Sequence, residues 1–263
     1  MYVGRAPSPA PDPPVGPSPQ NTNTIPLRYK REVFSRPPLT RASLKPLFTI
    51  LGWMALWAVI LFACAGNLEW SRGRLYVVLV TCGVTSNWLI VSLNNPGLFA
   101  ERAKKHAGTK RFDKFFGPLF TVLSFALLIV AGLEERFHAP ATGPILALLG
   151  AVFYLVGLAP MTWAMAVNPH LERTVRIQTD RGHRVISVGP YRIVRHPMYA
   201  GLIVSTLSAP LIFGSPWTWL PSGLLAVLMI WRTALEDRTL RAELAGYEDY
   251  ARRTRYRLVP GLW

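Results

Sequence analysis

Long uncharged runs constrain this chain more than any other feature of its sequence. Three runs, Leu47–Ala65, Leu75–Leu93 and Phe115–Leu133, contain 19 residues each, and Gly143–Val167 contains 25. A helix of about 20 apolar residues crosses the roughly 30 Å hydrocarbon core of a bilayer. A helix also satisfies its own backbone hydrogen bonds there. The runs therefore predict a four-helix transmembrane region over residues 46–167.

A fifth uncharged run, Met198–Trp231, has 34 residues, which is too long for one crossing and short for two ordinary ones. Gly214, Ser215 and Pro216 near its middle form a turn signal. We predict a tight helical hairpin here, whose second arm continues past the apolar region as Arg232–Arg253. The predicted fold class is an all-α polytopic membrane protein with about six transmembrane helices and a C-terminal helical hairpin.

The charges of the chain test this arrangement. The net charge is +15, which could indicate a nucleic-acid partner, but the 29 Lys and Arg residues lie between the apolar runs. With six spans, alternate connections place 26 of the 29 on one side of the membrane. The positive-inside rule makes that side cytoplasmic. We therefore expect a multi-pass membrane protein with both termini in the cytoplasm and no nucleic-acid partner, although the 66–74 connection is slightly basic on the opposite side.

The first 46 residues have a different composition. They hold eleven of the 23 prolines, seven Lys or Arg residues and few large apolar residues. Such a segment cannot bury enough apolar surface to offset the entropy lost on ordering. We predict that residues 1–45 form a disordered, basic, proline-rich tail.

Residues 168–197 form the sizeable polar connection before the hairpin. Two short alternating runs, Thr174–Gln178 and Arg184–Val188, flank Asp180-Arg-Gly182. Alternation on both sides of a turn signal is typical of a β-hairpin. We predict a small β-hairpin cap on the cytoplasmic face.

Titratable and aromatic residues are concentrated where this connection enters the apolar run. The stretch Gly189–Gly201 reads GPYRIVRHPMYAG. Polar chemistry at the mouth of a membrane segment is costly and usually functional. The alternative is a basic interfacial anchor, with Arg and Tyr at headgroup level.

The order of motifs distinguishes these readings. Gly182-His-Arg-Val-Ile186 is followed by Gly189-Pro-Tyr191, by Arg195-His-Pro-Met-Tyr-Ala-Gly201 and, after the hairpin, by Arg232 with Glu236-Asp237. This order resembles the isoprenylcysteine carboxyl methyltransferase family and the related phospholipid methyltransferases, over residues 168–263. Asp237 stands where the family has a second Glu, which we expect to be harmless. Leu244–Tyr247 is one residue shorter than the family pattern, which leaves the alignment after Leu240 uncertain by one residue.

The resemblance implies S-adenosylmethionine bound at the cytoplasmic side and a lipophilic small-molecule or lipidated acceptor entering from the membrane. It implies that Arg232 faces the acceptor as the catalytic residue. The cofactor-binding residues that it implies are Gln178, His183, Arg184, Val185, Ile186, Tyr191, His196, Pro197, Met198, Tyr199 and Glu236.

These residue types suit those roles. A carboxylate such as Glu236 accepts hydrogen bonds from hydroxyl or amino groups. Tyr191 and Tyr199 can stack on adenine or face a sulfonium. The alternative for Arg232 and Glu236 is a simple ion pair between residues four apart on a helix. The three other histidines, His106, His138 and His170, fit no constellation and are expected to be solvated loop residues.

The sequence predicts no metal site, because the two cysteines, Cys64 and Cys82, match no metal-ligand spacing. Methyl transfer to a carboxylate, thiol or amine is the leading function, and phospholipid amine N-methylation is its main alternative. An NADPH-dependent sterol-type reductase is a rival, because such enzymes carry a similar element around His196–Tyr199. A non-enzymatic membrane adaptor is the other rival. The sequence decides neither the acceptor nor the oligomeric state.

Overall fold

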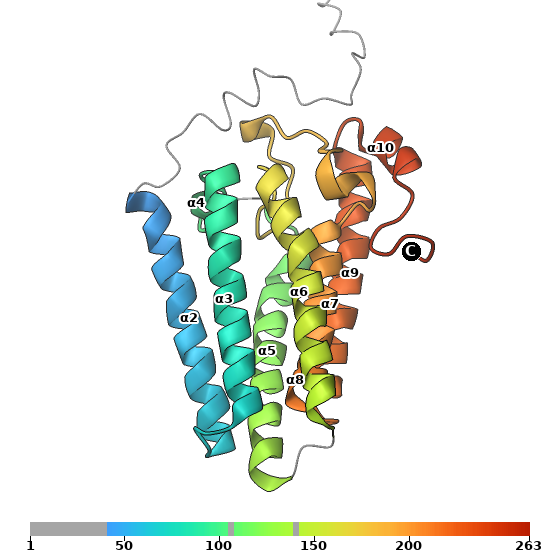
Figure 1. Cartoon of the computed structure of the whole chain (residues 1–263). Coiled ribbons are helices and arrows are strands. Elements are labelled where there is room, and N and C mark those ends of the chain that lie inside the picture. The colour runs from blue at the N-terminus through green and yellow to red at the C-terminus, as the bar shows by residue number, and fades with distance from the viewer. Residues whose placement is uncertain (1–40, 105–107, 139–141) are drawn as a thin grey trace, which may run out of the picture.

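The computed structural model describes residues 41–104, 108–138 and 142–263, which form a helical bundle (Figure 1). The helices are α2 (Arg41–Ala65), α3 (Ser71–Asn94), α4 (Leu98–Arg102), α5 (Arg111–Phe137), α6 (Pro144–Val167), α7 (Pro197–Leu207), α8 (Ala209–Phe213), α9 (Trp219–Glu243) and α10 (Tyr247–Arg253), with two 3-10 turns, η1 (Thr179–Arg181) and η2 (Gly189–Arg192). The predicted tail lies outside the described residues as far as residue 40. Its last five residues, 41–45, are helical and belong to α2.

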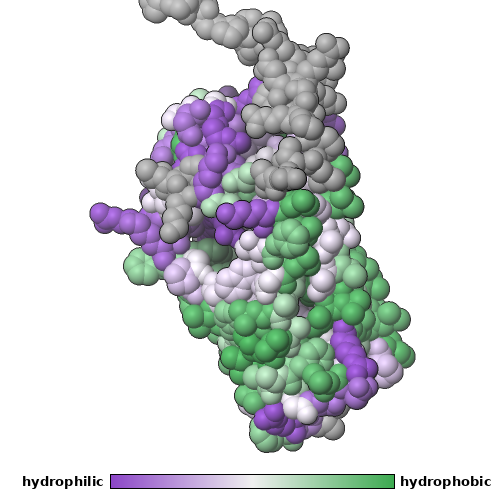
Figure 2. Space-filling view, turned by 90° about the vertical axis from the view of Figure 1, so that its left-hand side faces the viewer, coloured by the Kyte–Doolittle hydropathy of each residue, from purple (hydrophilic) through white to green (hydrophobic). Residues whose placement is uncertain are grey.

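Four helices in the described part of the chain are long and apolar enough to cross a membrane, by length and composition. They are α2, α3, α5 and α6, and they coincide with the four spans expected from the sequence. On the face that Figure 2 shows, apolar residues predominate in the middle and hydrophilic residues gather at the two ends. The chain is an integral membrane protein, and these four helices are its candidate membrane spans.

The C-terminal hairpin is present. Its first arm is the short apolar segment Pro197–Phe213, formed by α7 and α8. Gly214 ends this arm in the left-handed region (φ 68°), as the turn signal predicted. The second arm, α9, extends to Glu243 rather than to Arg253, because Gly246 adopts φ 78° and starts α10 in a new direction.

The predicted β-hairpin cap was wrong. Residues 168–196 contain the turns η1 and η2 and no strand. The backbone groups of the first run bond elsewhere: the Val175 N–H donates to the carboxylate of Asp113, and the Val175 carbonyl accepts from Lys110 N (3.3 Å). One backbone bond remains across the turn, from His183 N to the Gln178 carbonyl (3.1 Å). The first run therefore pairs with residues at the start of α5 instead of with the second run.

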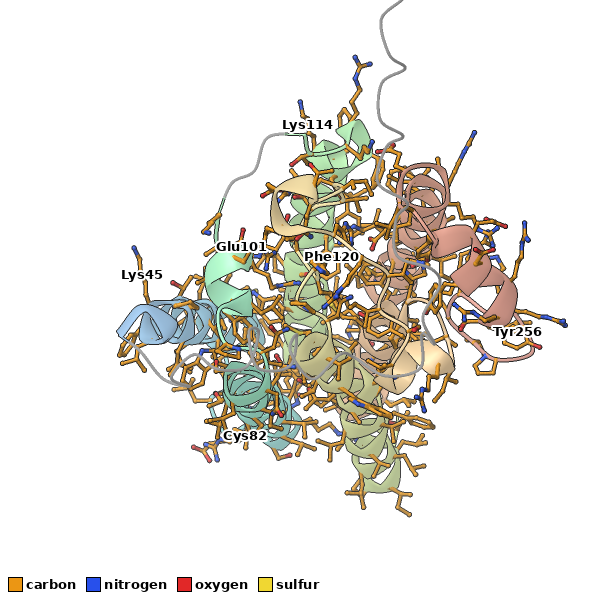
Figure 3. The ribbon with its side chains drawn as sticks, turned by 90° about the horizontal axis from the view of Figure 1, so that it is seen from above. Lys45, Cys82, Glu101, Lys114, Phe120 and Tyr256 are labelled. Carbon is orange, nitrogen blue, oxygen red and sulfur yellow. The ribbon has the colours of Figure 1, made fainter. Side chains whose placement is uncertain are left out.

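The core lies between the long helices. A buried cluster that includes Leu61, Leu128, Tyr154 and Ile212 joins α2, α5, α6 and α8. Seen from the end of the bundle, Phe120 of α5 lies near the middle, while Lys45, Lys114 and Tyr256 lie at the rim (Figure 3).

Helices α6 and α7 approach each other closely. A Cβ atom added at Gly157 would lie 2.5 Å from the backbone oxygen of Gly201. Small residues permit such contact between membrane helices. This packing sets α7 firmly against α6 and thereby fixes the position of the His196–Tyr199 element at the start of α7.

Candidate functional site

A pocket lies where the 168–196 connection covers the start of α7, the middle of α9 and α10. Of the twelve predicted site residues, eleven line this one pocket. They are Gln178, His183, Arg184, Val185, Ile186, Tyr191, His196, Met198, Tyr199, Arg232 and Glu236. The twelfth, Pro197, is buried as the first residue of α7, a position that suits the fixed φ of proline. Segments far apart in the sequence thus meet at one site.

The C-terminal segment holds the start of α7 in place. Arg195 N donates to the Tyr256 carbonyl and His196 N to the Arg257 carbonyl, both over 2.9 Å. These bonds place the imidazole of His196 directly before the first turn of the helix. The ring of His196 stacks on that of Tyr199, with centroids 5.8 Å apart and planes 4° apart.

Glu236 reaches the pocket from α9 and contacts Tyr199. The Tyr199 hydroxyl donates to Glu236 Oε2 over 2.5 Å. A short bond from a hydroxyl to a carboxylate is among the stronger hydrogen bonds in proteins. It fixes the carboxylate in a partly buried position.

Arg232 does not pair with Glu236. Its Nε lies 3.0 Å from Asp113 Oδ1, across the bundle on α5, and its Nη2 donates to the Arg173 carbonyl over 2.5 Å. The guanidinium carbon lies 4.3 Å from the ring centre of Phe116, a cation–π contact. The alternative of a simple ion pair along α9 was therefore wrong. Arg232 is a buried cation with a buried counterion, and it lines the pocket.

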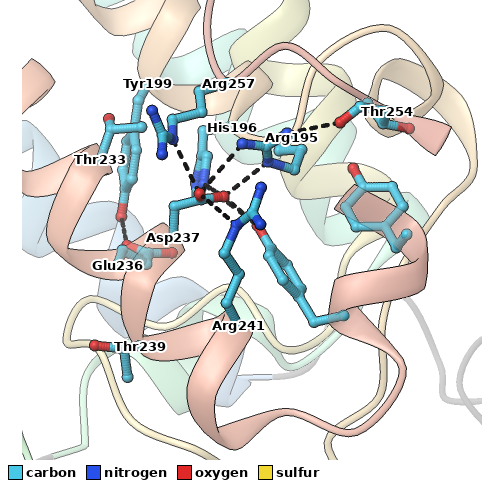
Figure 4. A network of polar contacts seen from close by, with 12 residues as sticks. Arg195, His196, Tyr199, Thr233, Glu236, Asp237, Thr239, Arg241, Thr254 and Arg257 are labelled. Carbon is cyan, nitrogen blue, oxygen red and sulfur yellow. Dashed lines mark hydrogen bonds and ion pairs between the residues drawn. The ribbon is translucent and has the colours of Figure 1, made fainter. Parts of the chain in front are cut away.

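The next residue on α9, Asp237, is the centre of a polar network (Figure 4). Its carboxylate is fully buried. Arg195 binds it with two nitrogens, at 2.7 and 3.2 Å, and Arg257 binds it at 2.9 Å. Tyr247, His196 and Arg241 complete the set, at 3.0, 3.3 and 3.2 Å. We expected Asp in place of Glu to be harmless, and the structure assigns this shorter side chain a central structural position.

Gln178 lines the pocket, but other residues already occupy both ends of its amide. Its Nε2 donates to the His170 carbonyl over 2.6 Å, and its Oε1 accepts from Arg181 over 2.8 Å. Its side chain is 2% exposed. The amide therefore holds the connection together.

The Tyr191 hydroxyl is likewise engaged. It accepts from Asn168 Nδ2 over 2.9 Å, and the Tyr191 carbonyl accepts from the Tyr250 hydroxyl over 2.8 Å. The face of the ring is the part of Tyr191 that remains for a ligand. A stacking role suits such a ring better than a hydrogen-bonding role.

Two histidines of the connection face each other in the pocket. The rings of His170 and His183 have centroids 4.8 Å apart. Burial lowers the pKa of His183, whose Nδ1 accepts from Gln178 N over 3.3 Å. Burial, with the neighbouring His183, lowers the pKa of His170 to about 4. Both rings are therefore neutral at pH 7.

Sequence reasoning missed His170. We expected a solvated loop residue, but the side chain is 8% exposed and lines the pocket. His138 is exposed as expected, and His106 lies outside the described residues. The only available signal for His170 was its position in the polar connection that precedes the motif.

Comparisons with known proteins bear on the same part of the chain. Residues 145–244 match the family model described as phospholipid methyltransferase. The match takes in α6, upstream of the motifs that suggested the resemblance, and stops at Leu244.

Two individual proteins are similar in part. The chain is 29% identical over 96 residues to the Delta(14)-sterol reductase erg24 of Schizosaccharomyces pombe (strain 972 / ATCC 24843). The aligned segment is 35% of this chain and 23% of that protein, so the chain spans less than a quarter of this relative's length.

The other is a solved structure, that of the eukaryotic intramembrane Ras methyltransferase ICMT (isoprenylcysteine carboxyl methyltransferase). It superposes with a TM-score of 0.47 at 14% identity, covering 82% of this chain and 96% of that one. The family match and the pocket coincide in sequence. Residues 145–244 thus carry the sequence pattern of the phospholipid methyltransferase family, and they contribute most of the pocket lining.

Proposed function

We propose that this protein is an integral-membrane methyltransferase that uses S-adenosylmethionine and a lipophilic acceptor. The observation that carries the proposal is the meeting of eleven of the predicted site residues in one pocket. A merely interfacial basic anchor would require no such convergence of loop, hairpin and α9. The family match over residues 145–244 supports the same reading.

The residues present fit this cofactor. Glu236 offers a carboxylate for hydroxyl or amino groups, and the rings of Tyr191 and Tyr199 offer faces for adenine or a cation. The backbone of residues 183–186 borders the pocket, where its N–H and C=O groups can pair with a base edge. S-adenosylmethionine would supply a methyl group on a positively charged sulfur. The protein's part is to align that group with the acceptor and to exclude water.

The acceptor is proposed to be a membrane-borne nucleophile next to Arg232. A prenylcysteine-like carboxylate needs no base, and the guanidinium of Arg232 would orient it. Because Asp113 already balances part of the charge of Arg232, the acceptor would meet a paired guanidinium rather than an isolated one.

Amine N-methylation of a phospholipid is the second candidate, favoured by the description of the matching family model. An amine acceptor must lose a proton during the reaction. Glu236 and Asp113 are the carboxylates near Arg232 that could take it, directly or through water.

The similarity to a sterol reductase supports a third candidate, an NADPH-dependent reductase. The similarity covers less than a quarter of that protein. Binding measurements in detergent separate the candidates. We expect micromolar binding of S-adenosylmethionine or its demethylated product, S-adenosylhomocysteine, and no binding of NADPH. Binding of NADPH alone would favour the reductase, and binding of neither would favour a non-enzymatic adaptor.

Glu236→Ala tests the site itself. Loss of a charge-assisted hydrogen bond costs about 1.5–3 kcal/mol, which is roughly a 10- to 150-fold loss of affinity for S-adenosylhomocysteine. Isothermal titration calorimetry measures this loss. The matched control is Glu243→Ala, because Glu243 lies on the same helix but pairs with Lys110 outside the pocket (2.6 Å). Unchanged affinity in Glu236→Ala would remove Glu236 from the site.

A further inference from the structure

The pocket contains a buried imidazole whose two nitrogens lack hydrogen bonds. In the part of the chain that the structure describes, the buried side-chain nitrogens of the pocket without a hydrogen-bond partner are Nδ1 and Nε2 of His170 and Nε of Arg232. Arg232 Nε is 3.0 Å from Asp113 and thus has an ion-pair partner. Among the described residues, no hydrogen-bond or ion-pair partner is left for the ring of His170, although the residue is more than nine-tenths buried.

No nearby polar group of the described residues forms a hydrogen bond with this ring. The amide of Gln178 donates to the backbone carbonyl of His170, not to its ring, and its oxygen accepts from Arg181. The ring of His183 contacts that of His170 at a tilt of 36°, and its own Nδ1 accepts from the backbone N–H of Gln178. Burying polar atoms without partners is unfavourable, so a side chain in this state usually has a role that compensates the cost.

The backbone of His170 is also held in place. The backbone N–H of His170 donates to Asn168 Oδ1 over 2.9 Å. Asn168 is in turn fixed by its bond to the Tyr191 hydroxyl and by Asn95 Nδ2, which donates to the Asn168 carbonyl over 3.1 Å. A rigid backbone with unpartnered ring nitrogens facing a pocket is the arrangement expected of a preformed ligand contact.

The chemistry of the ring selects the kind of ligand group. A neutral imidazole presents one donor and one acceptor. Burial and the neighbouring cations, including Arg181 and Arg184, oppose its protonation. It therefore complements a neutral group with donors and acceptors, as in adenine or ribose, rather than a carboxylate or an ammonium group.

We infer that His170 is a cofactor-binding residue whose ring nitrogens hydrogen-bond the nucleoside part of S-adenosylmethionine. This inference rests on the proposed function. It adds to the site a residue that lies upstream of the motifs and that no motif marks. The contact would complete the hydrogen bonding of the ring only when the pocket is filled.

His170→Phe is the informative variant, because phenylalanine keeps an aromatic ring against His183 and removes both nitrogens. The melting temperature of the ligand-free protein should stay the same or rise, since two unpartnered buried atoms are removed. Affinity for S-adenosylhomocysteine should fall roughly 5- to 10-fold, the loss expected for one or two neutral hydrogen bonds. The rise in melting temperature caused by saturating ligand should shrink accordingly.

The matched control is His138→Phe, because His138 is exposed in a connection outside the pocket. It should leave affinity unchanged. Analogues of S-adenosylhomocysteine, each altered at one adenine position or one ribose hydroxyl, then show whether His170 contacts the ligand directly or only positions other groups. The wild-type protein should lose affinity for the analogue that lacks the contacted group, and His170→Phe should show no further loss with it.

The outcomes distinguish the two proposals. Unchanged affinity in a folded His170→Phe protein overturns the inference and leaves the proposed function intact. An equal loss for every analogue also overturns it, because His170 would then act on the pocket's shape alone. No binding of S-adenosylhomocysteine to the wild-type protein rejects the proposed function, and this inference with it.

Discussion

Arg232 combines a proposed role in catalysis with several structural contacts. Its planar guanidinium reaches the carboxylate of Asp113 and the carbonyl of Arg173 with different nitrogens, while its face lies on Phe116. A lysine carries the same charge at a single point and cannot reproduce these three contacts. The contacts of Arg232 therefore depend on the planar shape of its guanidinium as well as on its charge.

We predict that Arg232→Lys lowers turnover with the true acceptor by 10-fold or more, about 1.4 kcal/mol. Affinity for S-adenosylhomocysteine should change by no more than a few fold, because the positive charge is kept. Methyl transfer to short prenylcysteine analogues and to amine-headed lipids, with calorimetry in parallel, measures both quantities.

Arg238→Lys is the control for Arg232→Lys, since Arg238 is exposed on the same helix. If Arg232→Lys behaves like the wild-type protein in both assays, Arg232 has a structural role only and does not orient the acceptor. If binding and turnover fall together, Arg232 belongs to the cofactor site.

At the scale of elements, α9 connects the site to the rest of the molecule through Asp237. This carboxylate binds Arg195 before α7, Tyr247 of α10 and Arg257 of the C-terminal segment. Such a group aligns three segments that each contribute to the pocket or support it. Its neighbour Glu236, on the adjacent position of the same helix, points to Tyr199.

We predict that Asp237→Asn destabilises the protein by about 3–5 kcal/mol, because Arg195 would remain buried without its counterion. Thermal unfolding in detergent measures the loss as a lowered melting temperature. Asp249→Asn on α10 is the control, since the Asp249 side chain is 78% exposed. An unchanged melting temperature in Asp237→Asn would show that the network contributes no net stability.

At the scale of the whole molecule, the distribution of Lys and Arg predicts how the chain is oriented in the membrane. The two ends of α5 test it directly, because Lys114 and His138 lie near its opposite ends and both are exposed. With six crossings and cytoplasmic termini, Lys114 should face the cytoplasm and His138 the other side.

We predict that single cysteines at these positions are labelled from opposite sides of sealed vesicles. Cys64 and Cys82 are first replaced by alanine, since both are free thiols. The cysteine at position 114 should react from the cytoplasmic side and the one at position 138 from the other. The reverse pattern, or labelling of both from one side, would contradict the predicted topology.

The sequence by itself determined the four long membrane helices and the C-terminal turn. Uncharged runs specify a helix locally, because in lipid each helix must satisfy its own backbone groups. Gly214 marked the turn for an equally local reason, its positive φ. The family resemblance also implied a set of site residues, eleven of which line one pocket.

Only the tertiary structure decided the partners of those residues. The counterion of Arg232 is Asp113 on α5, and the alternating run around Val175 bonds to α5 instead of forming a hairpin. His170 became buried because the connection folds over the pocket. Each of these outcomes depends on contacts between segments distant in sequence, and neither spacing nor composition carries information about such contacts.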